Sequence, residues 1–532
     1  MINLDITFLR KLHGIWMHIK SLVISSSQSG ILLPILICLN LSITLFLSAN
    51  LNIDGDEVYS LDTTGKDIGY ALHQALYVEQ QSPLYFILLN LWRSLNSSIF
   101  FARLFSILCI ALAIYVVAGV SRRFLKDIHP CWVTASVAFN PFVIWAAVEI
   151  RLYAFTILLS ALLLLSFFDG YLTKVPQTKA RWFYVAFSVL AIYTQYYIVF
   201  LLVANAVALL VLRRWHAFRN YLFGTIIVGL CFAPMLLIIP EQLSDVTQAQ
   251  GVVPSVYPQT ITIRDYLFNG FKYMLQRVLY YIFPGSKTTS LTASLKIVFV
   301  PTLCIVLVYF MKEIRRSITA KDIAILTIAF TLFLSFLTLS ILISPGLVEH
   351  RHTASFFLPV MLSVFVAVKG IPKRNALFIW IIVTIFYYST SLYVIYKPMA
   401  KSGDWERIAS YIMTAEKPHQ DILAFTPEVA VILGYYYSGP NAIVPIPQKQ
   451  NFQTYNLHDF VLKDEKQILT ALSGVPVEHQ FLWLVQYATT ADSADSYNNW
   501  ILEKFISKYY VVESSRNFFE SKVRLLHWKS IS

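Results

Sequence analysis

The chain has 532 residues, of which 57% are hydrophobic and only 14% charged, and its formal net charge is +12. The charges fall in clusters between apolar runs of about 20 residues, roughly the length of helix that crosses a bilayer, so the composition excludes an ordinary soluble protein. The basic residues form no patch within one polar stretch, which also argues against a nucleic-acid-binding protein.

The apolar runs predict an α-helical polytopic membrane protein with about 11 transmembrane helices. The first run is too long for a signal peptide and lacks a small-residue cleavage site, so we expect an uncleaved span. The five cysteines lie in or beside the runs, so no disulfide framework and no zinc site is predicted. The runs lie near 31–50, 100–121, 131–148, 153–169, 182–197, 198–212, 221–240, 293–311, 322–344, 354–368 and 375–396.

Lysine and arginine predict the direction of the spans, because cytoplasmic loops hold the basic excess. With the N-terminus inside, six successive cytoplasmic segments are basic, whereas the longer segments on the other side hold fewer basic residues. We therefore expect a multi-pass protein of the plasma (inner) membrane with a cytoplasmic N-terminus and a periplasmic or extracellular C-terminal part. The inside residues are Arg10, Lys11, Lys20; Arg122, Arg123, Lys126; Lys174, Lys179, Arg181; Arg213, Arg214, Arg219; Lys312, Arg315, Arg316, Lys321; and Lys369, Lys373, Arg374.

Two parts of the outer side are expected to fold. Residues 52–99 contain a mixed polar and apolar stretch and the short apolar helix 84–92, both predicted to lie at the membrane surface. After 397 the pattern becomes α/β, with helices near 404–415, 427–437, 463–473 and 493–508 and strands near 421–425, 480–486, 509–513 and 522–527. The predicted domains are a cytoplasmic segment 1–30, a transmembrane catalytic domain 31–396 that includes the surface-helix loop 52–99, and a soluble α/β domain 397–532.

An acidic doublet, Asp56-Glu57, directly follows the first span. One explanation is structural: Asp54 or Asp56 caps the helix that begins here. The other is catalytic: one carboxylate is a general base that takes a proton from an acceptor hydroxyl, and its neighbour maintains the site through hydrogen bonds. Gly55 would then allow a sharp backbone turn beneath the two acids.

The turn between the third and fourth runs carries Glu149, Arg151 and Tyr153. An interfacial anchor with a local ion pair would explain these residues. Because the predicted topology places the turn on the same side as Asp56, the alternative is a second carboxylate directed into one outer cavity, with Arg151 orienting it.

The turn between the ninth and tenth runs reads Glu349-His-Arg351-His352. A solvated turn would account for it. The alternative is a cationic site for the phosphate of a lipid-linked donor, which would stabilise the charge that develops on the departing phosphate. Arg351 is the best candidate, since its guanidinium is always charged and forked.

In this order, the motifs resemble those of the GT-C superfamily of integral-membrane glycosyltransferases, in particular the branch similar to protein O-mannosyltransferases and bacterial lipid A sugar transferases. The likeness covers nearly the whole chain. Two positions depart from the family pattern: Gln81-Ser82-Pro83 stands where His-Pro-Pro is frequent, and His352 replaces a tyrosine. The matching positions are Asp56-Glu57, Pro83-Leu-Tyr85, Trp92, Arg103, Pro141-Phe142, Glu149-x-Arg151-x-Tyr153, Arg351 with Pro359, and Asp404-Trp405.

The resemblance implies a glycosyltransferase that moves a hexose or pentose from a polyprenyl-phosphate-linked donor to an acceptor hydroxyl at the extracytoplasmic membrane face, usually with inversion. It implies that Asp56 is the catalytic base and that Glu57 shapes the site. The expected substrate-binding residues are Arg103, Glu149, Arg151, Tyr153, Arg351 and His352.

The sequence leaves the acceptor open among a lipid, a polysaccharide and a protein. No cofactor is required beyond the lipid-linked sugar as co-substrate. The carboxylates are compatible with a divalent metal, but no His or Cys spacing demands one, so no metal ligands are assigned.

Two other functional classes of membrane protein are compatible with the sequence. A transporter or lipid flippase of cell-envelope precursors would also be polytopic, although ion-coupled transporters usually carry ionisable residues inside their spans. The apolar runs here are almost free of charge, which favours a surface active site. The third class is a catalytically inactive relative whose outer domain binds a partner.

Overall fold

The computed structural model describes residues 31–125, 127–242, 263–284, 290–342, 349, 351–454, 456–473, 481–487 and 496–529. Residues 1–30, predicted to be a cytoplasmic segment, lie outside this description. The chain divides into two compact units. The helical unit comprises 1–48, 81–237 and 259–397, and the α/β unit comprises 49–80, 238–258 and 398–532.

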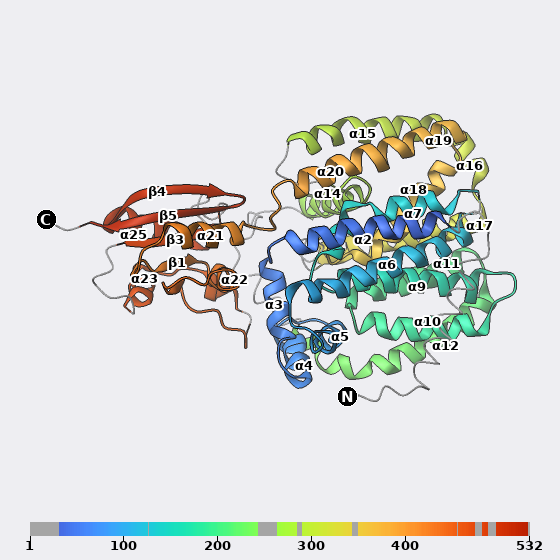
Figure 1. The fold of residues 1–532 in the computed structure, drawn as a ribbon. Helices are drawn as coiled ribbons and strands as arrows, with labels where there is room; N and C mark the ends of the chain where they lie inside the picture. The colour runs from blue at the N-terminus through green and yellow to red at the C-terminus, as the bar shows by residue number, and fades with distance from the viewer. Residues whose placement is uncertain are drawn as a thin grey trace. The chain divides into compact units, whose positions relative to one another are not determined.

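The helical unit is built from helices that run roughly alongside one another (Figure 1). Its long helices are separated by short turns. Several of the helices begin with a capping residue or a proline. In chain order they are α2 (Leu32–Asn50), α5 (Leu84–Arg93), α6 (Ile99–Phe124), α7 (Pro130–Ala138), α8 (Pro141–Ala147), α9 (Tyr153–Phe167) with the π-turn η2 (Phe168–Leu172), α10 (Thr178–Ile192), η3 (Tyr196–Ile198), α11 (Val199–Val211), α12 (Trp215–Phe232), η4 (Ala233–Leu237), α14 (Ile263–Ile282), α15 (Ser290–Tyr309), α16 (Met311–Ser317), α17 (Ala320–Leu342), α18 (Ala354–Lys369), α19 (Lys373–Trp380), η6 (Ile381–Tyr387) and α20 (Tyr388–Tyr396).

Within the described residues, six helical segments are long and apolar enough to cross a membrane. A seventh is added if α7 and α8, which are bent by 58°, count as one broken span. The predicted number of about 11 is therefore not confirmed. Several apolar runs fold as shorter helices, such as α10 with 15 residues and α18 with 16, because turns interrupt them before the usual spanning length of about 20 residues. The six are Leu32–Asn50, Ile99–Phe124, Tyr153–Leu172, Trp215–Leu237, Ala320–Leu342 and Phe378–Tyr396.

Burial differs sharply among these segments. The segment Tyr153–Leu172 is apolar on all sides, and 89% of its apolar window is buried, so it forms the centre of the unit. Two of its hydroxyl-bearing residues are satisfied locally, since the Thr156 hydroxyl donates to the Leu152 carbonyl and the Ser166 hydroxyl donates to the Leu162 carbonyl. By contrast, α12 leaves Phe223 and Leu230 exposed, as expected for a helix that faces lipid.

The α/β unit contains a five-stranded mixed sheet with strand order β2-β1-β3-β5-β4. Strand β1 runs parallel to β2 and β3, whereas β5 is antiparallel to β3 and β4. The predicted α/β pattern is confirmed, and β2 is the strand that the pattern missed, because its proline, Pro445, is unusual inside a strand. The elements are α3 (Gly55–Thr63), α4 (Ile68–Tyr77), α21 (Trp405–Ala415), β1 (Ile422–Phe425), α22 (Pro427–Gly434), β2 (Ile443–Ile446), η7 (Leu457–Phe460), α23 (Glu465–Leu472), β3 (Phe481–Tyr487), η8 (Ser496–Asn498), α25 (Asn499–Tyr509), β4 (Tyr510–Phe518) and β5 (Ser521–Trp528).

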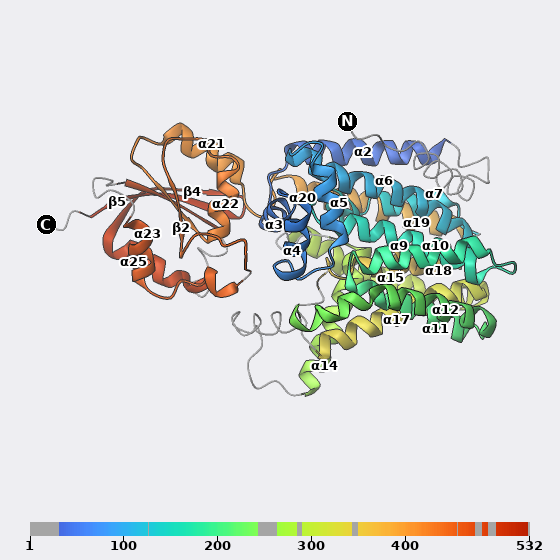
Figure 2. The same ribbon diagram turned by 90° about the horizontal axis from the view of Figure 1, so that it is seen from below.

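Helices cover both faces of this sheet (Figure 2). On one face, α23 and α25 pack against β1 and β3 in a cluster that includes Leu484, Leu502 and Phe505. On the other face, the α21 residue Trp405 makes an edge-to-face contact with Tyr487 of β3, with ring centroids 4.9 Å apart. Asp404 lies at the N-cap position of α21, but its carboxylate accepts from Arg407 rather than from a backbone N–H.

The surface-helix loop is shared between the units. Helices α3 and α4 belong to the α/β unit, while α5 begins at Leu84 in the helical unit, where the Leu84 N–H donates to the Tyr193 carbonyl over 2.9 Å. The acidic doublet is therefore part of the same compact unit as the C-terminal sheet. The predicted domain boundaries at 30/31 and 396/397 stay predictions.

Candidate active site

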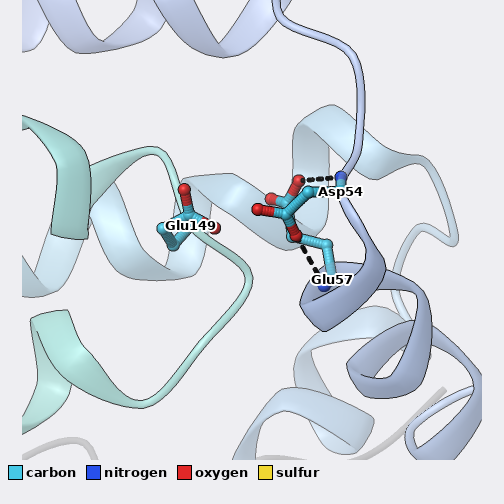
Figure 3. Close-up of side chains that lie close together, drawn as sticks. All are labelled: Asp54, Glu57 and Glu149. Carbon is cyan, nitrogen blue, oxygen red and sulfur yellow. Dashed lines mark hydrogen bonds between the residues drawn. The ribbon is translucent and has the colours of Figure 1, made fainter. Parts of the chain in front are cut away.

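The acidic stretch after α2 begins helix α3 with a capping box. The Glu57 N–H donates to Asp54 Oδ1 over 3.0 Å, and the Asp54 N–H donates to Glu57 Oε2 over 3.3 Å (Figure 3). Two backbone donors that a helix start leaves unpaired are thus satisfied. The structural explanation of the acids is correct for Asp54, whereas Asp56 takes no part in the capping box.

Glu57 is also the anionic member of a buried ion pair. Its side chain is fully buried, and its Oε2 atom lies 3.1 Å from Nζ of Lys401, whose side chain is 7% exposed. A carboxylate without water needs a nearby positive charge, because an unpaired buried ion is very unfavourable. Lys401 therefore provides the counter-charge for the second acid of the doublet.

Hydrogen bonds between the Asn52 side chain and the Lys401 backbone fix the same two segments to each other. The Asn52 amide donates to the Lys401 carbonyl over 2.9 Å and accepts from the Lys401 N–H over 3.0 Å. The Ile53 N–H donates to the Tyr436 hydroxyl over 2.7 Å. The start of α3 is thus held by the C-terminal half of the α/β unit through hydrogen bonds that leave little freedom of position.

Gly55 allows a close approach of Glu428 from α22. A Cβ placed on residue 55 would lie 1.5 Å from Glu428 Oε1, so the carboxyl occupies the space of the missing side chain. The expected sharp turn at Gly55 is wrong, since this residue is the first of α3 and Gly403 alone among the described glycines has a positive φ. The sequence marked the position correctly, but the reason is close packing.

Electrostatic repulsion and lost hydration shift the pKa values of Glu428 and Asp54, two members of the carboxyl cluster at the start of α3. Burial, followed by the charges of Asp56 and Asp54, raises the pKa of Glu428 to about 7, although the Tyr487 hydroxyl donates to its Oε1 atom over 3.2 Å. Burial and the charge of Glu57 raise the pKa of Asp54 to about 6, against the lowering effect of Lys401. The cluster can therefore take up and release a proton near neutral pH.

Asp56 is the second residue of α3 and is half-buried. Its charge contributes to the raised pKa values of both Asp54 and Glu428, so the three carboxyls lie near one another. Carboxylates of this kind are also suitable ligands for hard divalent cations. Chemically, the arrangement provides an acid–base group on a firmly held helix turn.

In the helical unit, the turn between α8 and α9 carries Glu149, Arg151 and Tyr153. All three side chains are buried, at 2%, 5% and 6% exposure. The Ser106 hydroxyl on α6 donates to the Glu149 carbonyl over 2.7 Å, and the Tyr153 ring stacks on Trp145. Buried side chains are not expected of an interfacial anchor, and a carboxylate directed into an outer cavity stays a prediction.

Arg103 lies near this turn. Its side chain is 1% exposed, and Nη1 donates to the Ser48 carbonyl over 3.0 Å, which satisfies an acceptor in the last turn of α2. Tyr396 at the end of α20 interacts electrostatically with both Glu149 and Arg103. The structure thus gathers Arg103, Glu149 and Tyr396 in one buried polar region of the helical unit.

Arg351 and His352 precede α18. Arg351 Nε lies 2.8 Å from Glu349 Oε2, and both side chains are about one-third exposed or more, at 33% and 40%. The His352 ring lies 5.8 Å from the Tyr197 ring, and the adjacent Thr353 hydroxyl is hydrogen-bonded to the Tyr281 hydroxyl. This partly exposed ion pair agrees with the solvated-turn explanation, and a donor-binding role of Arg351 stays a prediction.

The expected site residues therefore fall on two units. Asp56 and Glu57 belong to the α/β unit, and the other predicted residues belong to the helical unit, so their sharing of one pocket stays a prediction. Sequence reasoning missed Asn52, Lys401 and Glu428. Only Gly55 offered a local signal, because a glycine beside two acids is typical of a position where another group approaches closely.

No protein-family model matches this chain. No curated protein matches it either.

Several solved structures are similar to the chain, including the following three. ArnT from Cupriavidus metallidurans in the apo state has 14% identity and a TM-score of 0.44, and the match covers 94% of this chain and 98% of that one. The same protein bound to undecaprenyl phosphate has 13% identity and a TM-score of 0.42, with the same coverage.

The third structure is an Archaeoglobus fulgidus oligosaccharyltransferase tethered to an acceptor peptide with the NVT sequon. It has 11% identity and a TM-score of 0.41, and the match covers 90% of this chain and 72% of that one. The three similarities each span at least 90% of this chain.

Proposed function

We propose that this protein is a GT-C-type membrane glycosyltransferase. It moves a sugar from a polyprenyl-phosphate-linked donor to a hydroxyl of a lipid, polysaccharide or protein acceptor at the extracytoplasmic face of the membrane. Asp56 is the general base in this proposal, and the anomeric centre is inverted.

The observation that carries the proposal is the construction around Asp56. The capping box of Asp54 and Glu57, the buried Glu57–Lys401 pair and the hydrogen bonds of Asn52 fix the first turn of α3. Asp56 stands in this turn outside the capping box and keeps part of its surface exposed. A helix start alone needs only the Asp54 cap, so the additional buried charges favour a catalytic role over a purely structural one.

The chemistry of a carboxylate at this position suits acceptor activation. The Asp56 carboxylate takes the proton of the acceptor hydroxyl while the acceptor oxygen forms a bond to the anomeric carbon. At the same time, the bond from the anomeric carbon to the phosphate oxygen of the donor breaks. The products are the glycosylated acceptor, protonated Asp56 and the polyprenyl phosphate anion. Asp54 and Glu428 favour proton uptake at Asp56 when they are ionised, since like charges disfavour a further negative charge.

The helical unit offers surroundings that suit a lipid-linked donor. An apolar cavity of about 600 Å³ is lined mainly by aromatic and aliphatic side chains of α15, α19 and η6, among them Phe299 and Ile382, and by Phe283 just after α14. A prenyl chain is compatible with such a lining. Arg351 would bind the donor phosphate, and Arg103, Glu149, Arg151, Tyr153 and His352 would contact the sugar or the acceptor.

The transporter alternative predicts charged residues in the middle of the spans. In the described spans, the ionisable groups with defined partners lie near helix ends: Arg103 near the start of α6, Arg123 with Asp169 near the ends of α6 and η2, and Asp322 at the start of α17. This distribution supports reactions at a membrane surface rather than a path through the bilayer.

The experiment is a transfer assay on the purified full-length protein with Asp56→Asn. We expect this variant to keep the melting temperature and yield of the wild type and to lose transfer by at least about 100-fold, because it lacks the base but keeps its shape. The matched control is Asp62→Asn on the same helix α3, which should remain active. Near-normal turnover of Asp56→Asn would contradict the proposal.

Glycan and lipid analysis of the cell envelope identifies the acceptor. Cells without the protein should lack one glycosylated product, and wild-type protein but not Asp56→Asn should restore it. Restoration by both proteins would favour the inactive, partner-binding alternative, and accumulation of an untransported precursor would favour the flippase.

A further inference from the structure

A cavity with a basic lining lies in the helical unit at the far end of α6 from Arg103. It has a volume of about 700 Å³. Three candidate spans reach it, since it is lined at the last turn of α6, at the end of η2 and at the start of α17. At about 1.5 Å per residue, Arg103 and Arg122 lie roughly 30 Å apart along α6, about the thickness of a bilayer core. The cavity is therefore distinct from the polar region around Glu149.

Cations dominate the lining of this cavity. They are Arg122, Arg123, Lys174, Arg214, Lys321 and Lys369, against the single lining acid Asp127. Behind them, Arg123 pairs with Asp169 over 2.8 Å and Lys369 pairs with Asp322 over 2.6 Å. The lining and its paired acids together retain a positive charge.

These six cations come from five of the predicted cytoplasmic segments, which are far apart in the chain. The simplest explanation, based on membrane topology alone, is that each segment is basic only to set the direction of its neighbouring spans. That explanation requires no convergence of the side chains. The fold nevertheless brings one or two cations from each of the five segments to the same cavity.

Most of the remaining lining is apolar, apart from Thr173 and Thr319. Phe124, Phe168, Leu172 and Leu212 contribute hydrophobic surface, and Lys321 Nζ lies 4.6 Å from the centre of the Phe168 ring while donating to the Arg123 carbonyl. A site for a free anion would need only the charged groups. A charged group beside hydrocarbon surface at the end of membrane spans matches a lipid head group with its attached chains.

We propose that this cavity binds the phosphate group of an anionic membrane lipid. Arginine suits this ligand because its fork donates two parallel hydrogen bonds to phosphate oxygens, and lysine adds charge. Basic pockets between membrane helices on the cytoplasmic side are a known way of holding such head groups. The inference does not depend on the sugar-transfer activity, since it concerns the opposite end of the helices.

The test uses the full-length protein in a neutral detergent, with bound lipid counted by native mass spectrometry. The probes are phosphatidylglycerol, a polyprenyl phosphate, zwitterionic phosphatidylcholine and inorganic phosphate. We expect retention of phosphatidylglycerol well above that of phosphatidylcholine. If the polyprenyl phosphate is retained more strongly than phosphatidylglycerol, the bound lipid is a polyprenyl phosphate. That result would still support a site for a lipid phosphate.

The test variant is the double substitution Lys174→Gln/Lys321→Gln, called the first pair, and the control is the double substitution Lys312→Gln/Arg316→Gln. All four residues lie in predicted cytoplasmic segments, but Lys312 and Arg316 are exposed on α16 and do not line the cavity. We expect phosphatidylglycerol retention to fall on the order of tenfold in the first pair and less than about twofold in the control, since each basic residue near a lipid surface contributes modestly. If the first pair does not fold, the exposed Lys174→Glu replaces it.

Three results would overturn the proposal. The first is equal retention of phosphatidylcholine and phosphatidylglycerol, and the second is equal loss in the two variant pairs. The third is binding of inorganic phosphate to the protein without retention of any of the lipids, which would show that the site recognises a free anion.

Discussion

Lys401 and Glu57 form a buried ion pair, with Nζ and Oε2 3.1 Å apart, that joins the turn after the first span to the segment after the last one. Neither residue is predictable as a partner of the other from local sequence. Because both side chains are nearly inaccessible to water, the pair determines both the stability of this turn and the position of the neighbouring Asp56.

We expect Lys401→Met to destabilise the α/β unit by about 3 to 5 kcal/mol, because it leaves the Glu57 carboxylate buried without a counter-charge. Thermal unfolding of the purified protein measures this loss. Lys397→Met, on an exposed lysine four positions earlier, should change the melting temperature little. The double variant Glu57→Gln/Lys401→Met should recover part of the loss, since the two residues are coupled. Equal melting temperatures for Lys401→Met and Lys397→Met would contradict the ion pair.

Gly55→Ala tests the close approach of Glu428. An alanine in a free helix position would stabilise the helix by about 1 kcal/mol, but here its Cβ would displace the Glu428 carboxyl from Tyr487. We expect a net destabilisation of about 1 to 2 kcal/mol. The control is Gly434→Ala on α22, where a Cβ would meet no atom within 4 Å. Combining Gly55→Ala with Glu428→Ala should restore stability, and failure to do so would show that another group causes the clash.

Glu428→Gln should change the pH dependence of stability. The pKa of Glu428 is raised from 4.5 to about 7 by burial and by Asp56 and Asp54, so the folded state keeps a proton that the unfolded chain has lost. The free energy of unfolding therefore falls as the pH rises from about 4.5 to about 7. Glutamine does not titrate, so the variant should gain up to about 3 kcal/mol relative to the wild type above pH 7 and little at pH 4.5.

The measurement for Glu428 is the apparent melting temperature at pH 5 and pH 8. Asp54, whose pKa is raised to about 6, remains in the variant and leaves part of the pH dependence. The other groups that face Glu428 are Tyr487 on β3 and Tyr497. Glu406→Gln, on an exposed residue of α21, is the control. A parallel response of both variants to pH would show that Glu428 is not the responsible group.

Arg351→Ala should reduce donor binding or turnover more than Arg351→Lys does. The expected factor is about tenfold between the two variants, because lysine keeps the charge but loses the forked pair of hydrogen bonds. Glu349→Gln serves as the control, since it breaks the 2.8 Å ion pair and keeps the arginine. Its effect on stability should be small, because partly exposed ion pairs contribute about 1 kcal/mol or less. Small and equal effects of both arginine variants in a donor-binding assay would support the solvated turn.

The class of the fold could be predicted from the amino-acid sequence. Long apolar runs and α/β periodicity are local properties, so they predicted the membrane helices and most elements of the C-terminal sheet. The number of spans was less predictable, because apolar runs do not show where a helix breaks. Asn140, for example, ends one helix and caps α8 by accepting from the Phe142 N–H, which divides a predicted span into two bent pieces.

Asp56, Glu57 and Gly55 also stood out in the sequence, but the residues that surround them became apparent only in the folded chain. Lys401 and Glu428 reach the start of α3 from positions more than 300 residues later, and five separated basic segments meet at one cavity. Such contacts depend on chain segments that fold together across long distances. Hydropathy, periodicity and motif spacing describe neighbours along the chain, so they contain no information about which distant charges become partners once water is excluded.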